Sequence, residues 1–302
     1  MRFTPPLRPL VLLAAALLAA PLHAQLVIED DAGRRVALAA PAHRIVSLAP
    51  HLTEVLFAAG VGDRVVGVVA YSDYPAAARA LPQVGGYSNI DMEAIAALRP
   101  DLVVAWKSGN RDANLDRLAA LGIPVYVNES RSLDDVARTL EALGRLGGNE
   151  GGGRTAAEAF RARKAALAAR YSARPAVRTF YQIWDKPLMT INGEHIISDV
   201  LRLCGGTNVF GELAQLAPTI SVEAVLAANP EVVVASGMGE ARPEWLDQWR
   251  RWPALAAAAA GNLYFVPPEL IQRHTPRILD GAQQVCDFLD QARAKRSAER
   301  NR

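Results

Sequence analysis

Four histidines follow the first 24 residues, and imidazole is a common ligand of transition metals. They are His43, His51, His195 and His274. Zinc sites combine histidine with cysteine or carboxylate ligands in closely spaced sets, but this chain has no HxH or HExxH pair and no acidic, histidine-rich loop. His51 and Glu54 are one helical turn apart, which predicts a pair on the protein surface. We therefore expect no metal site.

Motifs of enzymatic catalysis are missing from the sequence as well. The chain lacks a GxSxG nucleophile turn, a P-loop and a GxGxxG run that opens a helix. The glycine-rich residues 147–153 precede a helical pattern, but no Lys-Ser or Lys-Thr pair follows them to bind a phosphate group. The sequence therefore favours a binding protein over an enzyme.

Five aromatic residues lie on or near the loops that follow predicted strands. They are Tyr71, Tyr74, Tyr87, Trp106 and Trp184. Ligands of α/β folds bind beside such loops, and flat aromatic rings suit a large, rigid, partly apolar ligand. Packing in the protein core is the alternative for each ring taken alone. As a group, the five residues predict the wall of a ligand-binding cleft.

The chain contains two cysteines, Cys204 and Cys286. In an oxidising compartment two cysteines can form one disulfide. That bond would close a loop of about 80 residues and contribute roughly 4 kcal/mol by restricting the unfolded chain. Two buried free thiols are the alternative.

The first 24 residues differ in kind from the rest. Arg2 and Arg8 precede a short apolar run at residues 11–20, and Ala24 offers a small residue for cleavage. This layout is typical of a secretory signal peptide. Its removal takes away two of the 33 basic residues and leaves 31 against 31 acidic ones. A neutral exported protein without a basic stripe is a poor binder of nucleic acid.

Three segments recur in the same order in the two halves of the chain. Residues 53–60 resemble 198–205 as helices opened by a hydroxyl cap and closed by glycine. Residues 93–106 resemble 223–236, each a short helix, a proline stop and a buried strand. Residues 122–127 resemble 261–266, each a glycine turn into a strand. Chance similarity of common αβ units is the alternative to a true duplication.

A single long helix is expected between the two halves. Thr155 and Glu158 have the spacing of a capping box, and residues 155–171 contain no glycine or proline. We predict a signal peptide at residues 1–24, an N-terminal α/β lobe at 25–148, a connecting helix at 149–173 and a C-terminal α/β lobe at 174–302. The cleft between two lobes with parallel sheets is then the expected ligand site.

Residues 44–60 (RIVSLAPHLTEVLFAAG) resemble the opening of class III substrate-binding proteins of ABC importers, the family that serves vitamin B12, haem and siderophore uptake. Residues 69–75 (VAYSDYP), 100–110 (PDLVVAWKSGN) and 276–286 (PRILDGAQQVC) are more similar to its cobalamin-binding members. The resemblance implies two α/β lobes joined by one helix, a periplasmic location, and a disulfide between Cys204 and Cys286. It implies capture of cobalamin or a related corrinoid, with no separate cofactor.

The resemblance also assigns roles to individual positions. Glu93 and Glu223 match the acidic residues that dock each lobe against arginines of a dimeric permease in the inner membrane. Tyr87 stands where cobalamin-binding members have a tryptophan contact, and Glu269 and Arg273 match ligand-facing positions, with aspartate replaced by Glu269. The pattern departs in two places, because residues 211–220 lack a tryptophan and Trp184 replaces a small residue. The pocket wall therefore differs from that of the relatives.

Two other ligands of the same family remain alternatives. A haem carrier would need an axial ligand such as Tyr71, Tyr74 or Tyr87. A binder of an anionic ferric siderophore would need several arginines in the cleft, and only Arg273 is a clear candidate. The sequence shows no sign of oligomerisation, so we expect a monomer.

Overall fold

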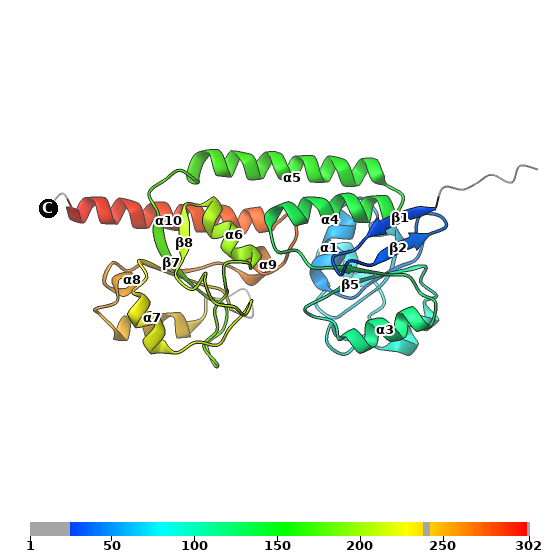
Figure 1. Cartoon of the computed structure of the whole chain (residues 1–302), viewed down its shortest axis with the longest axis horizontal. Coiled ribbons are helices and arrows are strands. Elements are labelled where there is room, and N and C mark those ends of the chain that lie inside the picture. The colour runs from blue at the N-terminus through cyan, green and yellow to red at the C-terminus, as the bar shows by residue number, and fades with distance from the viewer. Residues whose placement is uncertain (1–24, 238–241, 301–302) are drawn as a thin grey trace, which may run out of the picture.

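Two lobes, each built on a four-stranded parallel sheet, lie side by side beneath the long helix α5 (Glu150–Tyr171) (Figure 1). The structure is a computed structural model that describes residues 25–237 and 242–300. The predicted fold class, two α/β lobes with one long connecting helix, is confirmed. The predicted signal peptide lies outside the described residues, and none of the helices within them is long and apolar enough to cross a membrane.

The sheet of the first lobe has the strand order β4-β3-β5-β6. Its strands are almost fully buried, as expected for parallel strands covered on both faces. An antiparallel hairpin that the sequence analysis did not predict precedes this sheet. The elements are β1 (Leu26–Glu29), β2 (Arg35–Leu38), β3 (Ile45–Ser47), α1 (Pro50–Ala58), η1 (Gly62–Arg64), β4 (Val65–Val68), η2 (Ala76–Ala80), α2 (Met92–Ala97), β5 (Leu102–Trp106), α3 (Asp112–Ala120), β6 (Val125–Asn128) and α4 (Leu133–Leu146).

The sheet of the second lobe has the order β10-β9-β7-β8. Beyond α5, its elements are β7 (Val177–Gln182), α6 (Ile196–Leu203), β8 (Gly206–Asn208), α7 (Val222–Ala228), β9 (Val232–Ala235), η3 (Glu244–Arg251), α8 (Ala256–Ala259), β10 (Leu263–Phe265), α9 (Pro268–Ile271) and α10 (Ile278–Arg300).

The two sheets have the same topology, which confirms the internal repeat. In each lobe the first strand lies between the second and third, and the fourth flanks the third. The repeated segments fall on equivalent elements, since α2 and β5 correspond to α7 and β9. Arg99 and Asn229, the residues before the two prolines, both adopt positive φ values of 45° and 41°. Each helix therefore ends in the same way before its strand begins.

The connecting helix α5 begins at Glu150, within the predicted range 149–173, and not at the capping box predicted for Thr155. The Asn149 side chain caps it by accepting a hydrogen bond from the Gly152 amide at 3.0 Å. Glycine disfavours helix in isolation, but here it allows α4 and α5 to approach closely. A Cβ atom on Gly153 would lie 2.6 Å from the Leu140 carbonyl oxygen. The glycine run is thus part of the helix packing and not a linker.

The predicted hydroxyl caps of α1 and α6 are also wrong. Helix α1 begins at Pro50, and the N-cap of α6 is His195, whose Nδ1 accepts from the Ile197 amide at 3.1 Å. Thr53 and Ser198 lie inside these helices and are buried. Gly60 and Gly205 do follow the helices with positive φ, as predicted.

One apolar core continues through both lobes. It includes buried residues of α1 and α4 from the first lobe, of α6 and α10 from the second, and of α5 above them. Cys204, at the end of α6, is bonded to Cys286 in α10 with an S–S distance of 2.03 Å, which confirms the predicted disulfide. Because α5 and this core join the lobes, we expect only small hinge motion.

Candidate ligand-binding cleft

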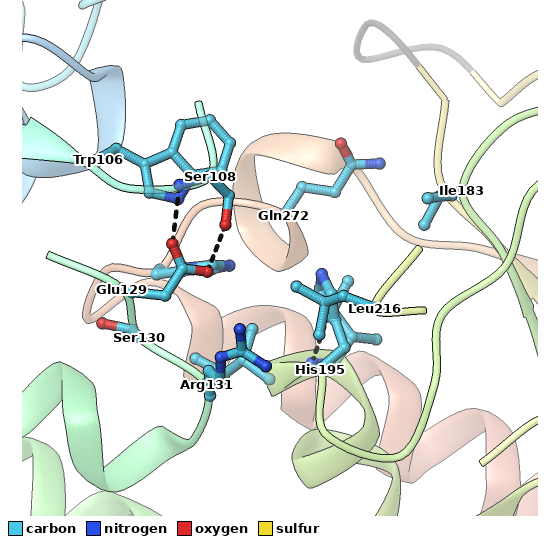
Figure 2. A pocket seen from close by; sticks show the side chains of 12 residues that line it. Trp106, Ser108, Glu129, Ser130, Arg131, Ile183, His195, Leu216 and Gln272 are labelled. Atoms are coloured by element: carbon cyan, nitrogen blue, oxygen red, sulfur yellow. Dashed lines mark hydrogen bonds between the residues drawn. The ribbon is translucent and has the colours of Figure 1, made fainter. Parts of the chain in front are cut away.

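A cavity of about 170 Å³ lies where the lobes face each other. It is smaller than the roughly 300–1,000 Å³ typical of small-molecule sites, so a large ligand would also occupy the space outside it. Both lobes contribute to its wall (Figure 2). The lining residues are Trp106, Ser108, Glu129, Ser130 and Arg131 from the first lobe, and Ile183, His195, Ile196, Ile197, Leu216, Gln272 and His274 from the second.

The first-lobe wall is built at the carboxyl ends of β5 and β6. Trp106 is the last residue of β5, and Glu129 follows β6 directly. The Glu129 carboxylate accepts hydrogen bonds from the Ser108 amide at 3.0 Å and its hydroxyl at 2.6 Å (Figure 2). Buried Asn110 accepts from the Trp106 amide at 2.7 Å and donates to the Tyr87 carbonyl at 2.7 Å. One amide side chain therefore fixes the backbone of two predicted ligand-binding residues.

The structure places the five predicted aromatic residues in two groups. Trp106 lines the cavity, and its ring centroid is 6.1 Å from that of Tyr87. The other four are exposed to an unusual degree for large aromatic side chains: Tyr71 by 76%, Tyr74 by 46%, Tyr87 by 43% and Trp184 by 37%. These four rings are available for contact with a ligand rather than packed in the core.

Three histidines form a continuous set of ring contacts across the lobe interface. His51 of α1 contacts His274 of the second lobe with ring centroids 5.4 Å apart, and His274 contacts His195 at 6.1 Å. His51 also contacts Trp106 edge to face at 5.2 Å. Within the described residues, no group of three or more histidine, cysteine or acidic side chains is placed to hold a metal ion.

Burial keeps these histidines uncharged. It lowers the pKa of His51 well below the ordinary value, and the neighbouring His274 and Arg273 lower it further. Burial lowers the pKa of His274 to about 4, with Asp135 opposing the shift. The pKa of His195 is lowered by burial, His274 and Arg131. A proton on any ring would place a positive charge beside the others.

The predicted surface pair of His51 and Glu54 does not exist, because both residues are buried. Glu54 instead binds two arginines of the second lobe. Its Oε1 lies 2.7 Å from Nη1 of Arg273 and 2.8 Å from Nη2 of Arg277. Arg273 also binds Asp73 at 2.6 Å. The helical spacing of His51 and Glu54 was correct, but the second lobe covers this face of α1.

Arg273 and Glu269, the predicted ligand contacts of the second lobe, lie outside the cavity wall. Arg273 is directed at the carboxylates of the first lobe, and Glu269 lies in the first turn of α9. Arg131 bridges the lobes at another point, 3.2 Å from Glu194. Sequence reasoning missed Ser108, Glu129 and Gln272, although the first two follow β5 and β6, where α/β folds place ligands.

Glu93 and Glu223 occupy equivalent positions on the two lobes, as the repeat predicted. Each is exposed and lies in the first turn of its helix, α2 or α7. Hydrogen bonds from its own backbone amide and from Ser221 hold the pKa of Glu223 below its ordinary value. A helix N-terminus also favours negative charge. Both carboxylates are therefore presented to solvent, and neither lines the cavity.

The buried histidines make the folded state sensitive to acid. Between pH 7 and 5 the unfolded state binds protons at His274, with an ordinary pKa near 6.5, while the folded state, with a pKa of about 4, does not. Stability from this residue is therefore complete above about pH 6.5 and is lost as the pH falls toward 4. We expect His274→Gln to remove on the order of 2 kcal/mol of the stability difference between pH 7 and 5. Urea unfolding at both pH values measures this, and an unchanged difference would contradict it.

Comparison with known proteins agrees with this architecture. A family model described as "Periplasmic binding protein" matches residues 45–270. The chain is 39% identical over 250 residues to a vitamin B12-binding protein of Vibrio cholerae, covering 82% of this chain and 90% of that protein. It is 38% identical over 245 residues to a vitamin B12-binding protein of Yersinia pestis, covering 81% and 85%.

Solved structures have the same fold. The periplasmic vitamin B12-binding protein of Vibrio cholerae has a TM-score of 0.77 at 38% identity, covering 84% of this chain and 98% of that chain. A periplasmic haem-binding protein of Roseiflexus has a TM-score of 0.71 at 24% identity, covering 83% and 99%, and shares the fold. These matches confirm the resemblance found in the sequence: the chain belongs to the periplasmic binding protein family.

Proposed function

We propose that this protein captures cobalamin or a related corrinoid in the periplasm and delivers it to the permease of an ABC importer. The observation that carries the proposal is the similarity to vitamin B12-binding proteins over 82% of the chain at 39% identity. The exposed aromatic rings support it, because they offer flat apolar contact area to a ligand too large for the cavity alone.

The charges around the cleft favour a corrinoid over the anionic alternatives. Arg273 is paired with Glu54 and Asp73, and Arg131 is paired with Glu194. Glu129 adds a further buried carboxylate to the cavity wall. Arg273, held by two carboxylates, is poorly available to an anionic ferric siderophore or to haem carboxylates, whereas an uncharged ligand rich in amide groups needs no free cation.

Delivery to the permease would use Glu93 and Glu223, the exposed glutamates of α2 and α7. Two equivalent carboxylates on two lobes of the same topology suit a dimeric permease that presents one basic pocket per subunit. Export through a signal peptide at residues 1–24, and action as a monomer, complete the proposal.

The ligand assignment predicts the outcome of a titration. Purified protein from residue 25 onward should bind cyanocobalamin with a submicromolar Kd and one-to-one stoichiometry, measured by isothermal titration calorimetry. Haem and a ferric siderophore, titrated in parallel, should bind more weakly. Tight binding of either one without cobalamin binding would keep the fold and the transport role but refute the corrinoid assignment.

If Glu93 and Glu223 dock the protein on the permease, their loss should affect cobalamin uptake by cells but not cobalamin binding by the protein. Replacing Glu93 and Glu223 together with Ala should abolish cobalamin uptake in cells, because each lobe loses its charged contact with the permease. The cobalamin Kd should not change, since neither residue lines the cavity. The control is Glu141→Ala, a glutamate on α4 whose side chain is 38% exposed, and this variant should support normal uptake. A weakened Kd in the double variant would show that the glutamates act on ligand binding instead.

A further inference from the structure

The loop at residues 69–75 presents Tyr71 and Tyr74 on a backbone that the first lobe holds only in part. Tyr71 has a φ of 66°, in the left-handed region that residues with bulky side chains rarely adopt. Its ring is 76% exposed, so packing of the ring does not fix this conformation. Within the first lobe, Thr53 donates to the Ser72 hydroxyl at 3.1 Å and Arg79 donates to the Asp73 carbonyl at 3.0 Å. The Ser72 amide also donates to the Val69 carbonyl at 3.3 Å, which closes a turn around Tyr71. These contacts hold the backbone of the loop, while both tyrosine side chains stay exposed.

Arginines of the second lobe make further contacts with this loop. Arg273 donates to the Tyr71 carbonyl at 3.2 Å and to the Asp73 carboxylate at 2.6 Å. The Arg277 guanidinium lies 3.9 Å from the ring centroid of Tyr74, within the range of a cation–π interaction. Each side of the loop is thus fixed by one arginine from the opposite lobe.

Glu54 orients both arginines at once. Its two carboxylate oxygens accept three hydrogen bonds of 2.7–2.9 Å from the two guanidinium groups. The Glu54 side chain is only 2% exposed and does not line the cavity. A buried carboxylate is stable only when it is paired, so Glu54 keeps both guanidinium groups beside it. From this position Arg273 and Arg277 reach the loop at residues 69–75.

We propose that Arg273 and Arg277 are positioning residues, which Glu54 orients and which set the conformation of Tyr71 and Tyr74 from across the cleft. The aromatic wall is therefore complete only while the lobes are in contact. Separation of the lobes would break the arginine contacts and release the loop together with the ligand. The ligand part of this inference rests on the proposed function, whereas the control of the loop does not.

A direct role of Arg273 in ligand binding, as the sequence resemblance implied, leads to the opposite expectation. If Arg273 contacted the ligand, loss of its partner Glu54 would free the guanidinium, and ligand affinity would stay the same or rise. If Arg273 positions Tyr71, loss of Glu54 weakens binding although Glu54 cannot touch the ligand. The variant Glu54→Gln separates the two roles, because it keeps the size of the side chain and removes its charge.

The test combines hydrogen exchange of the ligand-free protein with calorimetric titration of cyanocobalamin. Glu54→Gln should accelerate amide exchange in residues 69–75 and raise the cobalamin Kd roughly tenfold or more, as expected when hydrogen bonds to charged groups are lost. Asp73→Asn should change both quantities in the same direction by a smaller factor. Because the Asp73 side chain is 49% exposed, this variant tests the proposal even if Glu54→Gln unfolds. Glu141→Gln, which breaks the exposed ion pair with Arg161 between α4 and α5, is the control and should change neither quantity.

Each outcome decides a separate point. Unchanged exchange of residues 69–75 in both test variants would overturn the proposal, whatever the affinity. Faster exchange with an unchanged or tighter Kd would show that the loop conformation does not govern binding, and would also overturn it. If the unmodified protein bound no cobalamin, the proposed ligand would be wrong, while the exchange data would still decide whether the second lobe controls the loop.

Discussion

A single buried carboxylate, Glu54, connects the two lobes on the side of the aromatic loop. It is almost completely removed from solvent and is bonded to two arginines of the opposite lobe, while Asp73 balances the second positive charge. Removing one partner while the lobes stay in contact would leave a buried charge unpaired, which costs about 3–5 kcal/mol, so the closed interface requires all of these partners. The position of the second lobe, and with it the shape of the cleft, depends on this contact.

The long helix α5 and the apolar core beneath it also hold the two lobes together. Helix α5 packs along both lobes (Figure 1), and the core beneath it continues from α1 and α4 into α6 and α10. Arg131 with Glu194 adds a bridge at the cavity wall. A cleft held in this way is largely formed before the ligand arrives, which lowers the entropy cost of binding a bulky molecule.

Sequence reasoning predicted features that depend on local pattern and failed where distant segments meet. The two sheets, the repeat and the strand-end aromatics follow from apolar runs and proline or glycine stops within single αβ units. The cap of α5 at Asn149 did not follow, because Gly153 is required by contact with α4 and not by its own helix propensity. The burial of His51 and Glu54, and the pairing of Arg273, depend on packing between lobes, which helical spacing in one segment cannot reveal.

If the lobes are held at nearly fixed spacing, the cleft exists before the ligand binds. Small-angle X-ray scattering of the protein with and without saturating cyanocobalamin tests it most directly. The scattering curves of the two forms should superimpose, with an unchanged radius of gyration. A clear contraction on binding would contradict it, because the free protein would then have its lobes apart and the Glu54 contacts broken.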